Sequence, residues 1–554
     1  MDSLRMVAGL AFAISVFLLV EAWIKDHREP AAQPAKPTAG ATAPTSIAPP
    51  APTTTLGPNT AGAPQAPQGR VSQGQRIQVS TDMLMAEIDT AGGELRRLEL
   101  TKYRDTFNPQ KYFVLLDEAD SRTYVAQSGL IGKDLPNHNT LFKAEQLTYQ
   151  LAAGKDELVV ELQATAGPGA SVKKTYTFHR GSYVVDVAFE MRNLGSEPVE
   201  PYAYYQLVRD SKPAEGESKM VPTFSGIEVF TEKDKLHKMS FADIAKQKAG
   251  YSQTATDGWV ALVQHYFLSA WLPKPGTSRE MFVRNLDQSL IAAGVIQPMG
   301  RIEPGQTQIA ACRFYAGPQE QDLLKTLAPG LELTVDYGWL RVLAVPLFWV
   351  LNQIHSFVGN WGVAIIVLTV MIKLLFYPLS AASYKSMARM KVLAPKLQRL
   401  KERYGDDRQR MHQAMVELYK TEKINPLGGC LPIVVQIPVF IALYWVLLLS
   451  VELRQAPFVL VDHWIQDLSR PDPYFVLPVL MGATMFIQTW LNPTPPDPMQ
   501  AKLMKIMPIG FSIFFFFFPS GLVLYWLVNN ILSIAQQWRI TQVLERAKTA
   551  HGQS

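Results

Sequence analysis

The feature that most constrains this chain is a series of long apolar segments in its C-terminal part. Apolar runs lie at Trp361–Ala382, Leu427–Ser450 and Tyr474–Leu491, and a fourth apolar block extends from Ile506 to Ile540. Backbone N–H and C=O groups find no water inside a lipid bilayer, so segments of this kind cross it as helices. The fourth block would be about 52 Å long as a single helix, which exceeds a hydrocarbon core of about 30 Å. Pro519-Ser520-Gly521 divides it into two short spans, the first at Ile506–Phe518, so we predict a helical core of five spans within residues 359–540.

The N-terminal part of the chain predicts a membrane anchor followed by a linker. Met6–Ile24 is apolar except for Glu21. This run is longer than the apolar region of about 7–15 residues in a cleaved signal peptide, which favours a retained anchor helix within residues 1–29 over a signal peptide. Residues 30–70 are dominated by Pro, Ala, Thr, Gly and Gln. Such a composition cannot bury a core, so we predict a disordered linker there.

Residues 71–335 predict a β-sandwich. In Tyr183–Asn193, large apolar residues alternate with polar or small ones, which is the period of a strand with one buried face. Lys174–Arg180 and Leu158–Thr165 show the same period, and turn-forming Gly and Pro residues separate such runs. A region of roughly 260 residues with many short strands is typical of a large antiparallel sandwich. A helical pattern is expected at Gln319–Leu327.

The sequence gives no sign of an enzyme. The β region contains no Gly-rich phosphate loop, no cluster of metal-ligating residues and no nucleophile motif. The two cysteines, Cys312 and Cys430, fall in different predicted compartments and are expected to stay unpaired. We therefore expect no catalytic residues, no metal and no cofactor.

Residues 336–358 connect the β region to the spans. They are apolar and aromatic but contain Arg341, Asn352 and His355. This mixture favours an amphipathic helix that lies in the membrane interface over a further span.

The distribution of charge predicts how the chain is oriented in the membrane. Residues 383–424 contain eleven Lys or Arg residues against five Asp or Glu residues, a net charge of +6. The next connection, residues 451–473, contains two basic and four acidic residues, a net charge of −2. Loops rich in Lys and Arg stay in the cytoplasm. The basic segment, the basic tail at 541–554 and both termini are therefore expected in the cytoplasm, and the β domain on the outer side of the membrane.

The basic segment 383–424 also shows helical periodicity. Apolar residues recur at three- and four-residue spacing on both sides of Gly405-Asp406-Asp407, which predicts two helices folded into a hairpin. Two interpretations of its basic face remain open: it rests on anionic lipids, or it docks a cytoplasmic client or the ribosome. The basic residues of the predicted docking face are Arg389, Lys396, Arg399, Lys401 and Arg403.

One cation, Lys373, lies in the middle of the first predicted span of the core. Placing a cation there costs about 2.5–3.5 kcal/mol on scales derived from membrane insertion. The five predicted spans contain no Asp or Glu, so an ion pair within them is excluded. Either the lysine reaches toward the cytoplasmic interface, or it faces a hydrated groove with the polar residues of the other spans, each of which could also serve ordinary interhelical hydrogen bonding. The candidate groove residues are Lys373, Thr369, Gln436, Thr484, Gln488, Asn529 and Asn530, and Ser533 is a further polar residue of the spans.

Several stretches of the core resemble the YidC, Oxa and Alb family of membrane protein insertases. The anchor, the linker and the large β domain resemble the Gram-negative form of this family, in which the domain is a periplasmic β-supersandwich. The matching stretches are Tyr377-Pro378-Leu379, Asn425-Pro426-Leu427-Gly428-Gly429-Cys430, Val451-Glu452-Leu453-Arg454-Gln455-Ala456-Pro457-Phe458, Asp497-Pro498-Met499-Gln500 and Phe518-Pro519-Ser520-Gly521-Leu522-Val523-Leu524-Tyr525.

The resemblance implies a groove, open to the cytoplasm and to lipid, whose positive residue attracts acidic groups of a client. That residue is usually Arg in the family, and the matching position here is Lys373, which keeps the charge without the bidentate fork. Thr369 and Trp526 match positions that contact client helices. The implied partners are client membrane proteins, the Sec translocon, and the ribosome or nascent chains.

Together these observations predict an insertase and folding chaperone of a bacterial inner membrane, working alone or with the Sec translocon. The alternative is a small-solute transporter or channel, because polar residues in spans also fit that class. The absence of intramembrane carboxylates from the predicted spans argues against proton or cation coupling.

Overall fold

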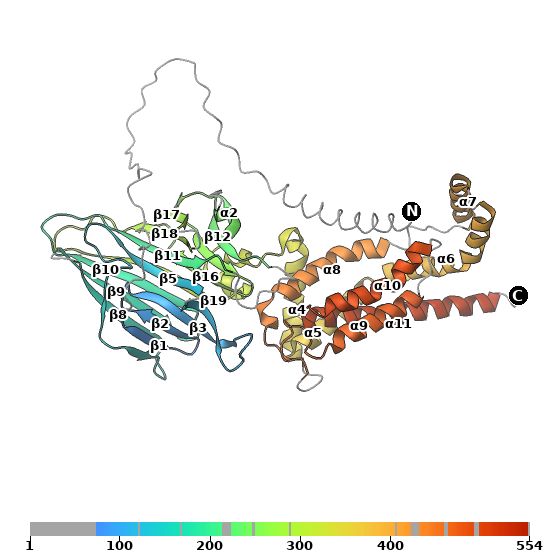
Figure 1. Cartoon of the computed structure of the whole chain (residues 1–554), viewed down its shortest axis with the longest axis horizontal. Helices are drawn as coiled ribbons and strands as arrows, with labels where there is room; N and C mark the ends of the chain where they lie inside the picture. Colours follow the sequence, from blue (N-terminus) through green and yellow to red (C-terminus); the bar gives the residue numbers. More distant parts are fainter. Residues whose placement is uncertain are drawn as a thin grey trace, which may run out of the picture. The chain divides into compact units, whose positions relative to one another are not determined.

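The structure of the chain is a computed structural model that describes residues 74–119, 122–166, 169–212, 223–245, 250–286, 290–404, 407–422, 431–458, 464–491 and 498–551. The predicted anchor and linker, residues 1–70, lie outside the described residues, as does Cys430. The chain divides into two compact units, one formed mainly by residues up to Gly317 and one mainly by residues from Leu331 onward. We call them the β unit and the helical unit (Figure 1).

The β unit consists of two large sheets and a short helix, α2 (Phe241–Ala245). The strand pairs are mainly antiparallel, and β1 with β7 is a parallel exception. The ten-stranded sheet has the order β14 (Thr254–Ala255), β17 (Arg279–Asn285), β18 (Leu290–Pro298), β11 (Tyr202–Asp210), β5 (Arg122–Ile131), β4 (Tyr112–Ala119), β3 (Glu94–Arg104), β2 (Leu84–Asp89), β1 (Arg76–Ser80) and β7 (Thr148–Gln150). The nine-stranded sheet has the order β13 (Lys235–Ser240), β12 (Gly226–Thr231), β15 (Trp259–Gln264), β16 (Phe267–Pro273), β19 (Thr307–Pro318), β10 (Val184–Asn193), β9 (Ala170–His179), β8 (Glu157–Ala166) and β6 (Lys143–Ala144).

Alternating burial along the strands forms the core of the β unit. In β10, Val185, Phe189 and Met191 are fully buried, while the residues between them are more exposed. Strands β8, β9 and β10 occupy the segments where alternation predicts strands, so this prediction is confirmed. The two sheets pack face to face, since the Tyr205 hydroxyl on β11 donates to the Ala310 carbonyl on β19 at 3.1 Å.

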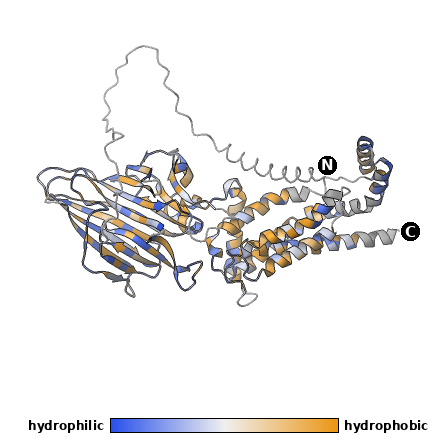
Figure 2. Ribbon diagram, viewed as in Figure 1, coloured by the Kyte–Doolittle hydropathy of each residue, from blue (hydrophilic) through white to orange (hydrophobic). Residues whose placement is uncertain are grey.

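The helical unit is built from α-helices whose ribbon is largely hydrophobic, whereas hydrophobic and hydrophilic residues alternate along the strands of the β unit (Figure 2). Helix α3 confirms the helical pattern expected at Gln319–Leu327. The helices are α3 (Gln321–Leu327), α4 (Arg341–Val358), α5 (Trp361–Leu375), α6 (Tyr377–Tyr404), α7 (Arg408–Thr421), α8 (Leu431–Leu449), α9 (Val476–Leu491), α10 (Pro498–Phe515) and α11 (Ser520–His551).

By length and composition, the described residues contain one helix that could cross a membrane, Gly338–Val358. A second candidate arises if the bent pair Trp361–Leu375 and Tyr377–Ser386 forms one span, and Val435–Leu449 and Val476–Leu491 are shorter apolar helices. The number of spans in the core therefore stays a prediction. The position of α4 in the membrane interface also stays a prediction. In this helix Phe348 is buried and Phe357 is 87% exposed.

Two helices have bounds that differ from those of the predicted apolar segments. The predicted span Trp361–Ala382 is bent by 63° between α5 and α6. Pro378 has no N–H and restricts the backbone of the residue before it, so the chain turns at this point. Helix α10 begins at Pro498 rather than at Ile506. Proline fits the first turn of a helix, and polar residues continue a helix beyond its apolar part, so the apolar pattern alone underestimates its length.

Two predicted helix breaks are confirmed. Helix α10 ends at Phe515 and α11 begins at Ser520, on either side of the Pro519 break. Helix α7 begins after Asp407, whose Oδ1 accepts hydrogen bonds from the N–H groups of Gln409 and Arg410 at 3.2 and 3.1 Å. This side chain caps α7 and separates it from α6. Helix α6 itself runs without a break through residue 383, the predicted start of the hairpin.

Candidate functional site

Three polar side chains fix the N-terminal ends of the helices that carry the candidate site. The Asn360 Oδ1 accepts from Val363 N at 3.1 Å at the start of α5. The Asp472 Oδ2 accepts from Leu477 N at 2.7 Å at the start of α9. The Ser520 Oγ donates to Arg470 O at 2.6 Å at the start of α11. The Asn360 and Asp472 side chains cap free N–H groups at the starts of α5 and α9, and the Ser520 bond ties the start of α11 to the connection that precedes α9.

Lys373 lies in the last turn of α5, half-buried against α11. Its Nζ donates to the Ser533 Oγ at 2.8 Å. The Ser533 Oγ donates in turn to Asn529 O at 2.7 Å. Within the described residues, the ion pairs of the structure give Lys373 no carboxylate partner, and its contact with Ser533 is to a neutral dipole.

Gln436 on α8 joins this group, because its Nε2 donates to Asn529 Oδ1 at 3.4 Å. Three of the predicted groove residues therefore lie in one chain of hydrogen bonds that connects α5, α11 and α8. We call Lys373, Gln436, Asn529 and Ser533 the Lys373 cluster.

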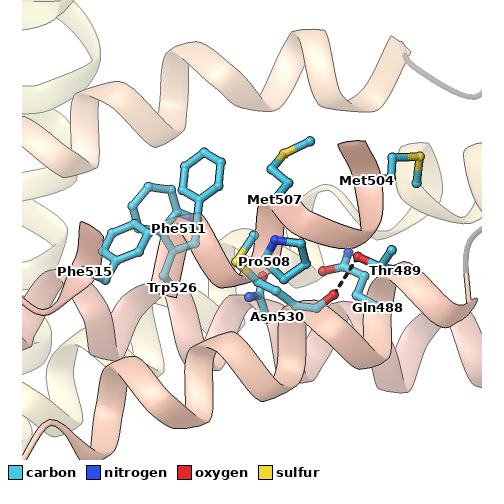
Figure 3. Close-up of a pocket in the computed structure, with 10 residues that line it drawn as sticks. Gln488, Thr489, Met504, Met507, Pro508, Phe511, Phe515, Trp526 and Asn530 are labelled. Carbon is cyan, nitrogen blue, oxygen red and sulfur yellow. Dashed lines mark hydrogen bonds between the residues drawn. The ribbon is translucent and has the colours of Figure 1, made fainter. Parts of the chain in front are cut away.

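The remaining polar groove residues lie on another side of α11. Asn530 Nδ2 donates to Thr484 Oγ1 on α9 at 3.5 Å. Gln488 and Asn530 line a cavity of about 350 Å³ between α9, α10 and α11 (Figure 3). Consecutive residues of a helix point about 100° apart, which is why Asn529 and Asn530 face different neighbours. We call this space the α9–α11 cavity, and its lining residues are Met485, Gln488, Thr489, Met504, Met507, Pro508, Phe511, Phe515, Trp526 and Asn530.

Trp526 forms the aromatic end of the α9–α11 cavity together with Phe511 and Phe515, while Gln488 and Thr489 lie toward the other end (Figure 3). Its ring lies 4.2 Å from the ring of Phe515 on α10 and 4.4 Å from that of Phe440 on α8, measured between centroids. Trp526 therefore contacts both helices on either side of α11.

Thr369 is placed differently from the other predicted residues. Its hydroxyl donates to Ile365 O within α5 at 2.6 Å, and the residue is only 1% exposed. A buried hydroxyl that is already bonded to its own helix has little capacity to bind a further group. The structure brings it neither into the α9–α11 cavity nor into the hydrogen bonds of the Lys373 cluster.

Sequence reasoning counted Ser533 among the polar residues of the spans without pairing it with Lys373, and it missed much of the cavity. Ser533 follows Asn529 by four residues, so helical spacing places both on one face of α11. Met504 and Met507 are three residues apart on α10, which is also the spacing of one face. Whether these two methionines line a cavity depends on how α9, α10 and α11 pack together. The spacing of residues along α10 does not give that packing.

An ion pair between described side chains joins the two helices of the basic hairpin. The Nζ of Lys396 on α6 lies 2.6 Å from Glu422 Oε1 just beyond α7. Both Arg399 and Arg403 are exposed. Arg389 and Lys401 belong to α6, but their side chains lie outside those that the structure describes.

Both parts of the chain match known protein families. Residues 76–350 match the model of the YidC periplasmic domain, and residues 353–548 match the model of the 60Kd inner membrane protein. A membrane protein insertase YidC of Methylobacillus flagellatus is 55% identical over 548 residues, which cover 99% of this chain and 98% of the relative. That of Aromatoleum aromaticum is 54% identical over 552 residues, which cover 99% of each chain. A crystal structure of an active YidC insertase with its first transmembrane domain resolved is 19% identical and covers 84% of this chain and 92% of its own, with a TM-score of 0.39.

These matches define a class of bacterial inner-membrane proteins with a periplasmic domain rich in antiparallel sheets. The chain belongs to the YidC family of membrane protein insertases. Its function is the insertion of client membrane proteins.

Proposed function

We propose that a client segment crosses the membrane beside α11, with its charged or polar part at the Lys373 cluster and its apolar part at the α9–α11 cavity. The observation that carries this proposal is the hydrogen bond of Lys373 to a neutral hydroxyl at 2.8 Å, inside an apolar helix. A cation held by a neutral group keeps its full charge for an incoming anion, whereas a fixed carboxylate would neutralise it.

The polar groups of the Lys373 cluster favour a hydrated path rather than a dry contact. Gln436 and Asn529 meet at 3.4 Å, near the upper limit for such a bond. A weak amide contact is exchanged for water or for a client backbone at small cost. The cluster thus offers a client donors and acceptors that apolar helices lack.

The α9–α11 cavity has the properties of a site for varied apolar side chains. Its volume of about 350 Å³ lies in the range of ligand-binding clefts. Three methionines, Met485, Met504 and Met507, contribute to its lining. Methionine side chains adapt to differently shaped groups, which suits a protein that receives many clients.

The orientation and partners of the core complete the proposal. The basic hairpin lies in the cytoplasm, where exposed Arg399 and Arg403 bind either anionic lipid headgroups or the ribosome with its nascent chain. Both termini are cytoplasmic, residues 1–29 form a retained anchor, and the core has five spans within residues 359–540. The protein acts alone or beside the Sec translocon and needs no cofactor.

Crosslinking to a stalled client tests the proposed path. A photoreactive residue at Gln436 or at Met507 should crosslink to the client's entering segment. The matched control is Ile509, which lies two positions from Met507 on the opposite face of α10 and is 59% exposed. Equal crosslinking from Met507 and Ile509 would show that the client does not occupy the α9–α11 cavity.

A further inference from the structure

The hairpin between β3 and β4 carries an exposed aromatic side chain at its tip. Phe107 is 71% exposed, more than any other large hydrophobic side chain described in the β unit. A single exposed ring is common on protein surfaces, so Phe107 becomes informative only together with the ordered turn that presents it and the basic side chains beside it.

The tip is ordered by its own hydrogen bonds. The Asp105 Oδ1 accepts from the N–H groups of Phe107 and Asn108 at 2.8 and 2.7 Å. The backbone N–H of Asp105 donates to Lys111 O at 2.9 Å, and the N–H of Lys111 donates to Asn108 O at 2.9 Å. These bonds form a closed turn that presents the Phe107 ring outward.

Basic residues surround the tip. Lys102, Arg104 and Lys111 are all exposed, and Asp105 is the only acidic residue from 102 to 112, which leaves the segment with a net charge of +2. The oxygen of Asp105 is already bonded to backbone N–H groups. The surface of the tip therefore combines positive charge with one apolar ring.

The tip lies at the same end of the β unit as the end of β19, after which the chain continues into the helical unit. At the base of the hairpin, Thr101 Oγ1 donates to Asp82 O at 2.7 Å. Asp82 Oδ2 accepts from Gly181 N at 2.9 Å, in the turn between β9 and β10. Next to that turn, Tyr183 O accepts from Ala316 N at 3.1 Å, close to the end of β19.

We propose that this tip, residues 105–111 with Lys102 and Arg104, binds the periplasmic surface of the membrane. The Phe107 ring enters the headgroup region, and the three basic side chains bind anionic lipid phosphates. Aromatic rings and basic side chains are the residues that anchor proteins at membrane interfaces. The covalent link from Pro318 at the end of β19 to Trp361 at the start of α5 keeps the tip at high effective concentration near lipid, so one ring and three charges suffice.

Depth-dependent fluorescence quenching in nanodiscs tests this contact with the full-length chain. We use the variant Phe107→Cys in a Cys430→Ser background and label it with an environment-sensitive fluorophore, since Cys312 is only 3% exposed. The matched control is Leu194→Cys, because Leu194 is 54% exposed and follows the opposite end of β10. The discs contain phosphatidylcholine with or without phosphatidylglycerol, and brominated lipid serves as the quencher.

The label at residue 107 should show blue-shifted emission and quenching, which should increase at least about twofold with phosphatidylglycerol, while the label at residue 194 should show neither. Changing Lys102→Glu and Lys111→Glu together should remove that increase without changing the circular dichroism. Equal signals from the labels at residues 107 and 194 would overturn the proposal. So would the absence of quenching at residue 107 in discs that hold no protein other than this chain. The second result would leave a protein with an acidic surface as the partner of the tip.

Discussion

Replacing Lys373 should change insertion only for clients whose crossing segment carries negative charge. Lys373→Arg keeps the charge, Lys373→Gln removes it and Lys373→Glu reverses it. Each variant is compared on two matched clients, one with aspartate and one with asparagine in a short translocated tail. The Ser533→Ala variant serves as a control, because it removes the neutral partner at 2.8 Å and keeps the charge.

The expected size of the effect follows from the geometry. A client carboxylate that replaces Ser533 at Lys373 would bring two unit charges to about 4 Å, where they attract by about 1 kcal/mol in water and about 4 kcal/mol at an effective dielectric constant of 20. Losing the bond to Ser533 costs about 0.5–1.5 kcal/mol. Because Lys373 is half-buried, the coupling between the lysine and the client charge should be about 1–3 kcal/mol, or about 5- to 150-fold in rate.

Initial rates of tail translocation into proteoliposomes, followed by protease protection, measure this coupling. Lys373→Gln and Lys373→Glu should slow the aspartate client by the stated factor and leave the asparagine client within about twofold. Lys373→Arg and Ser533→Ala should retain most of the rate for both clients. If Lys373→Gln slowed both clients equally, the lysine would act through structure or packing, and the electrostatic reasoning would be refuted.

Two further predictions concern stability. Burial and the nearby charge of Lys174 lower the pKa of His138 from 6.5 to about 4, so the unfolded chain binds this proton first as the pH falls. The contribution of His138 to the free energy of unfolding of the β unit should therefore fall by up to about 3 kcal/mol between pH 6.5 and 4, whereas Glu94, whose pKa burial raises to about 7, contributes in the opposite direction. The difference in amide exchange of β5 and β11 between the full-length chain and His138→Gln, followed over this pH range, measures the His138 contribution. In the helical unit, a Cβ added at Gly362 would lie 2.2 Å from Phe458 Cδ2, whereas one at Gly510 would meet nothing within 4 Å. Gly362→Ala should thus destabilise the detergent-solubilised protein by about 1–3 kcal/mol and Gly510→Ala should slightly stabilise it; an equal shift of the unfolding temperature in both would contradict the packing described.

The sequence predicts local structure well where a residue type or spacing is favoured by only one kind of local structure. Alternation in β10 shows its buried face, because a strand exposes every second side chain to the same side. Asp407 marks the start of α7, since its carboxylate can bond the free N–H groups of a first turn. The bend at Pro378 cannot be predicted from the sequence in this way, because a proline within an apolar segment is compatible with a straight helix and with a turn.

The composition of the candidate site depends on tertiary packing and is therefore only partly predictable. The sequence indicates that Lys373 has no carboxylate within the predicted spans, and the structure gives it Ser533, which lies 160 positions further along the chain. A single groove was the simplest prediction for the polar residues. The rotation of α11 instead sends Asn529 toward α8 and Asn530 toward α9, so the residues belong to two sites. The sequence pattern of each helix does not show how α11 is rotated about its axis relative to α8 and α9.

The two adjacent asparagines also determine which motions of the core are easy. Turning α11 about its long axis would pull Asn529 away from Gln436 and Asn530 away from Thr484 at the same moment. Both contacts are long, at 3.4 and 3.5 Å, so breaking them costs little, and a rotation of α11 would open the Lys373 cluster and the α9–α11 cavity together.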